Sequence, residues 1–150
     1  MCCNILIEKL NANTDCFSHS NAAAENGQRF QLVLPKGEIA CRVQIDGCLI
    51  KEKHGEKKCD YLFYHCEADE YFFVELKGSD LQQAFLQLKS TIITLKPQLK
   101  FDKNQCNAFI SASKVSPSFR TKRQKFEEEF RKYYVKVIRI SSSSPEWVIK

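Results

Sequence analysis

The sequence lacks any stretch that could cross a membrane. None of its apolar runs approaches the roughly 20 residues that a spanning helix needs. The first residues, MCCNILIEKLNANTD, also lack the basic segment and long apolar segment of a secretory leader. From these absences we expect a soluble chain that has no membrane partner and works in the cytoplasm.

Internal repeats and long linkers are also absent, and 150 residues suit one domain with its own core. Hydrophobic residues make up 43% of the chain and charged residues 27%, which excludes a disordered or membrane class. We therefore interpret 1–150 as one domain with its core at about 39–115. A poorly patterned segment, 1–29, precedes the core, and a basic helix, strand and tail at 116–150 follow it.

Charge is distributed unevenly along the chain. The 23 basic and 18 acidic residues give a net charge of +5, but the first 75 residues carry 8 basic and 12 acidic side chains. The last 75 carry 15 basic and 6 acidic side chains. This division suits an acidic metal site beside a surface that binds a polyanion such as nucleic acid. On charge alone, random scatter explains the division equally well.

None of the eight cysteines belongs to a Cys-x-x-Cys pair, so the usual zinc and thioredoxin spacings are absent. A hairpin centred just after Lys53 would place Cys48 opposite Cys59 and Cys41 opposite Cys66. The odd spacing of Cys41 and Cys48 would put them on opposite faces of a sheet. In a reducing cytoplasm we expect the cysteines to be small buried apolar residues. Disulfides, or a zinc or redox role, are the alternatives.

Hydrophobic patterning predicts a mixed order of strands and helices. Strands are expected at 29–34, 38–50, 59–65, 71–78, 107–115 and 135–140. Three- and four-residue spacing predicts a helix from Leu81, capped by Ser79 or Asp80 and ended by Pro97. A second helix should begin with Ser116 and Pro117. The order predicts an α/β fold with a central mixed β-sheet that is flanked by helices. The chain would form an antiparallel meander first and continue as α-β-α-β.

Three charged residues stand in the two most apolar strands. Glu75 and Lys77 are two apart and share a face of their strand. In an antiparallel hairpin, the numbers of any two paired residues add up to the same sum. If that sum is 135, Asp60 faces Glu75, and if it is 137, Asp60 faces Lys77. Opposed carboxylates repel each other unless a cation lies between them, and Mg²⁺ binds through carboxylates, waters and substrate phosphate. A nearby lysine can orient the metal-bound water or stabilise transition-state charge, so the set predicts phosphodiester hydrolysis.

The string CDYL…FFVELKG, followed by an amphipathic helix, resembles the core of the PD-(D/E)XK phosphodiesterase superfamily over about residues 39–115. This superfamily includes nucleases of the restriction-endonuclease and Holliday-junction-resolvase type. The resemblance implies a restriction-endonuclease-like fold, with Asp60 and Glu75 as metal ligands and Lys77 as the catalytic lysine. It implies that the Leu76 carbonyl also reaches a Mg²⁺ or Mn²⁺ cofactor. The expected substrate is nucleic acid, DNA above all, and a homodimer would suit cleavage of both strands.

Further positions follow from the same resemblance. Family members often carry a glutamine that positions substrate on the helix after the second strand. Gln83 and Gln87 lie one turn apart on this helix, away from its apolar stripe. Glu25 and Glu38 are candidates for the third acid that the family often supplies from a preceding helix. Cys59 stands where many members have proline.

Basic residues supply candidate phosphate contacts. Lys114 follows the strand expected at 107–115, whose end lies near the active cleft in the family. Arg120, Lys122 and Arg123 begin the basic helix and suit contacts to a phosphate backbone. A solvated helix face explains the same residues equally well.

Two alternatives remain beside the nuclease hypothesis. Glu75 and Lys77 could form an exposed ion pair on a half-buried strand. The chain could also be a catalytically inactive nuclease-fold module that acts as a binding or immunity-type protein. His54 and His65 lie in or beside turns without a third ligand, so we expect them to be surface histidines.

Overall fold

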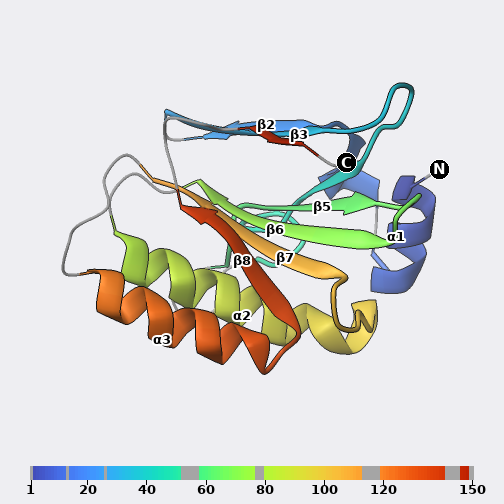
Figure 1. Cartoon of the computed structure of the whole chain (residues 1–150). Coiled ribbons are helices and arrows are strands. Elements are labelled where there is room, and N and C mark those ends of the chain that lie inside the picture. Colours follow the sequence, from blue (N-terminus) through green and yellow to red (C-terminus); the bar gives the residue numbers. More distant parts are fainter. Residues whose placement is uncertain are drawn as a thin grey trace.

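The structure, a computed structural model, describes residues 2–12, 14–25, 27–51, 58–76, 80–112, 119–140 and 146–148 (Figure 1). The described helices are α1 (Cys2–Leu10), α2 (Leu81–Leu99) and α3 (Phe119–Arg131), with a 3-10 turn, η1, at Thr14–Cys16. The described strands are β1 (Phe17–His19), β2 (Ala22–Glu25), β3 (Gln28–Val33), β4 (Cys41–Gln44), β5 (Tyr61–His65), β6 (Glu70–Leu76), β7 (Cys106–Ser111), β8 (Val135–Ile140) and β9 (Glu146–Val148).

The central sheet has the order β1-β4-β5-β6-β7-β8 within the described ranges. Strands β4, β5 and β6 form the antiparallel meander predicted from the sequence, and β7 and β8 then add in parallel. Parallel neighbours need a crossover connection, which α2 and α3 supply. The predicted α/β class, a central mixed sheet flanked by helices, is therefore confirmed.

Both faces of the central sheet are covered. The helices α1, α2 and α3 lie on one face, and a smaller sheet, β2-β3-β9, lies on the other (Figure 1). Residues alternate between the two cores along the strands. Leu62 and Phe73 pack toward the helices, whereas Phe63 and Phe72 pack against Phe30 of the smaller sheet. Burial on both faces explains why these strands appear in the sequence as nearly continuous apolar runs.

The smaller sheet was not expected. The alanines of β2 favour a helical turn by intrinsic propensity, yet Ala23 pairs with Phe30 of β3 and is buried. Segment 146–148, read from the sequence as part of a polar tail, pairs in parallel with β3 as β9. Tertiary pairing thus overrides the local preference in both segments.

The strand expected at 38–50 is shorter than predicted. It is hydrogen-bonded as β4 only over Cys41–Gln44. Gly47 adopts a φ of 76°, a left-handed conformation that suits glycine and turns the chain. The turn brings the chain back to the end of β4, where the Leu49 N–H donates a hydrogen bond of 3.1 Å to the Gln44 carbonyl.

Helix α2 begins as predicted but continues past its predicted end. The Asp80 side chain caps it by accepting a hydrogen bond from the Gln83 N–H at 3.0 Å. Pro97 lies inside the last turn, and the helix ends at Leu99, followed by the capping residue Lys100, which has a left-handed backbone. Phe85 stacks on Phe126 of α3 with ring centroids 4.7 Å apart. None of the described helices combines the length and apolar character needed to cross a bilayer.

The expectation that the cysteines are buried thiols is wrong for six of the eight. Disulfide bonds join Cys2 to Cys66, Cys3 to Cys41 and Cys16 to Cys48, and Cys59 and Cys106 are buried free thiols. Strands β4 and β5 pair antiparallel, but Cys41 lies opposite Tyr64 rather than opposite Cys66 as a hairpin centred just after Lys53 would require. Spacing alone does not determine which cysteines meet. All three disulfides fasten the segment that contains α1 and η1 to the rest of the domain.

Candidate functional site

Asp60 and Glu75 lie on neighbouring strands in the first of the two registers allowed by the sequence. Strands β5 and β6 pair with Tyr61 opposite Val74. Continuing that register by one residue places Asp60 opposite Glu75. Asp60 is half-buried, and Glu75 is 2% exposed. The Asp60 Oδ2 atom accepts a hydrogen bond of 2.8 Å from the Leu76 N–H, which ties this carboxylate to the end of β6.

Glu25 approaches Asp60, and Asp46 lies close enough to Glu25 for its charge to act there. Glu25 ends β2 of the smaller sheet and shares a side-chain hydrogen bond with Asp60. Loss of hydration, the charge of Asp60, this hydrogen bond and the charge of Asp46 together raise the pKa of the exposed Glu25 carboxyl. We call Glu25, Asp46, Asp60 and Glu75 the acidic cluster. A hydrogen bond between two carboxyl groups needs a proton on one of them, and a cation placed between them would remove that need.

Neighbouring groups respond to the negative charge of the acidic cluster. Burial raises the pKa of the Cys59 thiol, and the charges of Glu75 and Asp60 raise it further. Burial also raises the pKa of the Tyr61 hydroxyl, and the charge of Glu25 adds to that effect. Each shift disfavours another negative charge at this end of the sheet. The same field would stabilise a bound cation.

Helix α2 borders the acidic cluster through Cys59. The Cys59 N–H donates a hydrogen bond of 2.8 Å to Thr91 Oγ1, one helical turn after Gln87. The sequence placed Gln87 away from the apolar stripe, which is wrong, because Gln87 is buried. Its Oε1 atom has no hydrogen-bond partner among the described residues. Gln83 is half-buried, and the buried Lys58, which the sequence did not single out, donates a hydrogen bond into α2.

Several predicted site residues are not described. Lys77 and Lys114 lie outside the described residues. Arg120 belongs to α3, but its side chain is not among those described. Their roles remain predictions from the sequence.

Two basic residues of α3 have described partners. Lys122 Nζ donates a hydrogen bond of 3.3 Å to Gln82 Oε1, which places the start of α3 beside the first turn of α2. Arg123 Nε donates to Glu127 Oε1 at 2.7 Å, a pair within the helix. Lys122 thus lies beside the helix that follows β6, whereas Arg123 is engaged with its own helix.

Glu38, the other candidate for a third acid, lies at the opposite end of β5. Its Oε1 atom is 3.0 Å from Nε2 of His65, the last residue of that strand. His65 is 2% exposed, so the expectation of a surface histidine is wrong. In the described part of the chain, sets of three ligand side chains within 4.8 Å occur around Glu67 at this end, and not in the acidic cluster. Glu25, not Glu38, is the acid that reaches Asp60.

A cavity of about 840 Å³ also lies away from the acidic cluster, where β7 and β8 begin. Its lining includes Glu70, Glu127, Arg131 and Lys136, so both signs of charge are present. Within it, Asn107 Nδ2 donates a hydrogen bond of 2.7 Å to Glu70 Oε2. The concentration of one sign of charge distinguishes the acidic cluster from this cavity.

Sequence reasoning missed Asp46, although a signal for it was present. It directly precedes Gly47, a residue type that often marks a bend inside a strand. The Ile45 N–H donates to the Asp60 carbonyl at 2.9 Å, so Asp46 follows directly at the same sheet end. A carboxylate beside a glycine turn, one strand away from Asp60, was therefore recognisable.

Comparison of the chain with models of known protein families, with curated proteins and with solved structures finds no match.

Proposed function

We propose that this chain is a metal-dependent nuclease that hydrolyses phosphodiester bonds of nucleic acid, DNA in the first instance. The observation that carries the proposal is the acidic cluster, in which Asp60 lies opposite Glu75 and hydrogen-bonds to Glu25. Crowding of carboxylates costs stability unless a proton or a cation compensates. A divalent cation with oxygen ligands fits this donor set.

In this proposal Asp60 and Glu75 hold Mg²⁺ or Mn²⁺ together with the Leu76 carbonyl. The contact from the Leu76 N–H leaves Asp60 with free lone pairs, because each carboxylate oxygen accepts more than one hydrogen bond. When bound, the metal would polarise the phosphodiester and activate water. Lys77, two residues after Glu75, would stabilise the developing negative charge.

The architecture is compatible with the restriction-endonuclease-like fold that the sequence resembles. The meander β4-β5-β6 is followed by α2 and by the parallel strand β7, with the cluster at the end where β6 stops. Lys122 lies beside α2 and would contact phosphate, with Lys114 and Arg120 as further candidates. A homodimer would place two such sites on one duplex.

Plasmid cleavage tests the proposal. The protein should nick or cut DNA in Mg²⁺ or Mn²⁺ and not in chelator. Asp60→Asn, Glu75→Gln and Lys77→Ala should each lower the rate at least about 100-fold, because each removes a metal ligand or a transition-state charge. Glu128→Gln, which removes an exposed carboxylate of α3, is the matched control and should cleave normally. Equal cleavage by wild type and Lys77→Ala would identify a contaminating nuclease and reject the proposal.

A non-catalytic binding or immunity-type module is the second candidate. The observation that favours it is that no three ligand atoms of the described acidic cluster lie within 4.8 Å of one another. Calorimetric titration separates the two functions. Binding of Mg²⁺ or Mn²⁺ that Asp60→Asn removes supports the nuclease, whereas no binding to wild type supports the module.

A further inference from the structure

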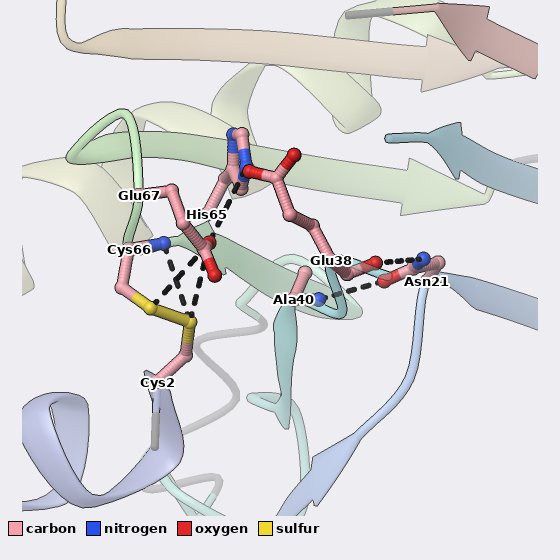
Figure 2. A network of polar contacts seen from close by, with 7 residues as sticks. All are labelled: Cys2, Asn21, Glu38, Ala40, His65, Cys66 and Glu67. Carbon is pink, nitrogen blue, oxygen red and sulfur yellow. Dashed lines mark hydrogen bonds and ion pairs between the residues drawn. A yellow bond between two sulfur atoms is a disulfide. The ribbon is translucent and has the colours of Figure 1, made fainter. Parts of the chain in front are cut away.

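A second group of metal-ligand side chains lies at the other end of β5, far from the acidic cluster along that strand. His65 ends β5 with its ring buried, and its Nε2 atom is 3.0 Å from Glu38 Oε1 and 3.4 Å from Glu67 Oε2. The three residues come from three segments: the strand, the loop before β4 and the turn between β5 and β6. Figure 2 shows both carboxylates directed at the same edge of the imidazole.

The backbone around Glu38 is held in place. The Asn21 side chain accepts a hydrogen bond from the Ala40 N–H at 2.7 Å and donates to the Glu38 carbonyl at 3.4 Å (Figure 2). The Glu38 N–H donates to the Pro35 carbonyl at 3.1 Å. The carboxylate therefore extends from a loop whose position is fixed on both sides.

The turn that carries Glu67 is fixed as well. The Asp69 N–H donates to the Cys66 carbonyl at 3.2 Å, and the Tyr64 hydroxyl donates to Asp69 Oδ1 at 2.8 Å. The disulfide from Cys2 to Cys66 ties the same turn to α1. Both glutamates are thus presented by constrained backbone, as preorganised metal sites require.

The spacing and the charge of this group fit a cation. Ligand atoms about 2.0–2.2 Å from a tetrahedral Zn²⁺ lie roughly 3.3–3.6 Å from one another, near the 3.0 and 3.4 Å that separate His65 Nε2 from the two carboxylate oxygens. Two carboxylates and a neutral imidazole balance a charge of +2. An imidazole ligand selects a borderline metal over Mg²⁺, which prefers oxygen atoms only. Because Cys2 and Cys66 are joined to each other, the donor set is one nitrogen and two carboxylates rather than thiolates.

We propose that His65, Glu38 and Glu67 bind a transition-metal dication of the Zn²⁺ class. The site is separate from the acidic cluster and does not depend on the proposed nuclease function. Its ion would join the loop before β4 to the β5–β6 turn, and water would complete the coordination. The competing account is an ion pair between protonated His65 and the two glutamates, which needs no metal.

Calorimetric titration of the metal-free, unreduced protein with Zn²⁺ tests the proposal. In excess Mg²⁺, which would fill the acidic cluster but cannot compete for the site at His65, one Zn²⁺ should bind per chain. Glu67→Gln should weaken this binding at least about 100-fold, because it removes a ligand while keeping the shape of a partly exposed side chain. His65→Gln should do the same. The His65 Nδ1 atom has no hydrogen-bond partner among the described residues, so this change removes no further described polar contact.

Controls separate this site from the acidic cluster and from misfolding. Glu128→Gln, on α3, should bind Zn²⁺ like wild type. Asp60→Asn should also bind it, even though that change should abolish Mg²⁺-dependent cleavage. Co²⁺ should give the strong visible absorption of four-coordinate cobalt in wild type and lose it in Glu67→Gln. If His65→Gln does not fold, Glu38→Gln and Glu67→Gln decide the result. No Zn²⁺ binding, or binding that survives these substitutions, overturns the proposal.

Discussion

Removing the disulfide between Cys16 and Cys48 should lower the free energy of unfolding by about 3 kcal/mol. The two cysteines are 32 positions apart. With the bond between Cys3 and Cys41 intact, however, the shortest loop that the Cys16–Cys48 bond closes runs through that other bond and has about 20 residues. Closing a loop of this length lowers the chain entropy of the unfolded state by an amount worth roughly 3.3 kcal/mol. Both cysteines are only half-buried, so changing them to alanine leaves little cavity. The two alanine substitutions therefore remove the cross-link and little else.

The assay is urea unfolding of wild type and of the Cys16→Ala/Cys48→Ala double variant, without and with a phosphine reductant. The difference in unfolding free energy should be about 3 kcal/mol without reductant and should disappear with it, because reduction opens the bond in wild type too. Alkylation of the unfolded, unreduced wild type should modify two thiols, Cys59 and Cys106, and all eight after reduction.

Two results would refute this reasoning. A difference below about 1 kcal/mol without reductant would mean that the cross-link is absent or that the unfolded chain is already constrained. A difference of the same size in both conditions would assign the loss to packing of the two side chains.

Two further substitutions test how α2 is held. Phe85→Ala should lower the free energy of unfolding in urea by about 3–5 kcal/mol, because the buried Phe85 ring stacks on Phe126 of α3 with centroids 4.7 Å apart. The control Leu86→Ala, at a side chain that is 45% exposed, should lower it by less than about 0.5 kcal/mol. Similar losses for both variants would contradict this packing. Asp80→Ala should lower the free energy of unfolding by about 1 kcal/mol, because it removes the side chain that caps α2. Asp80→Asn should keep most of that stability, because an amide oxygen also accepts the hydrogen bond from the Gln83 N–H. Equal losses for the two variants would argue against the cap.

Local patterns in the sequence predicted the elements near the acidic cluster. The short turn between β5 and β6 limited Asp60 to two partners, and the structure selects the register that places it opposite Glu75. The three- and four-residue spacing after Asp80 predicted α2, because one face of a helix had to be apolar to cover the sheet. Strand β8 occupies the predicted 135–140. These features depend on neighbours close in sequence, whose geometry is nearly fixed.

Features that depend on distant segments were not predictable in the same way. Glu25 reaches Asp60 only because β2 belongs to a smaller sheet over the central one, and nothing near Glu25 in the sequence indicates that layer. His65 looked like a turn residue because the loop that carries Glu38 and covers it is more than 20 positions away. The cysteine pairs were likewise decided by which segments the fold brings together.

The disulfides also bear on where the chain works. Disulfide bonds persist in oxidising compartments and are rare where glutathione keeps thiols reduced. The cytoplasmic setting suggested by the sequence remains a prediction, and the three bonds weigh against it.

The parallel pairing of β3 with β9 has a consequence for how the protein is made. It joins Gln31 to Glu146, so the smaller sheet gains its third strand only after most of the chain has been synthesised. Contacts of such long range form slowly. Until then, one edge of β3 offers unpaired amide and carbonyl groups next to the apolar Leu32. Nascent or refolding chains at high concentration should therefore self-associate through this edge before they reach the native state.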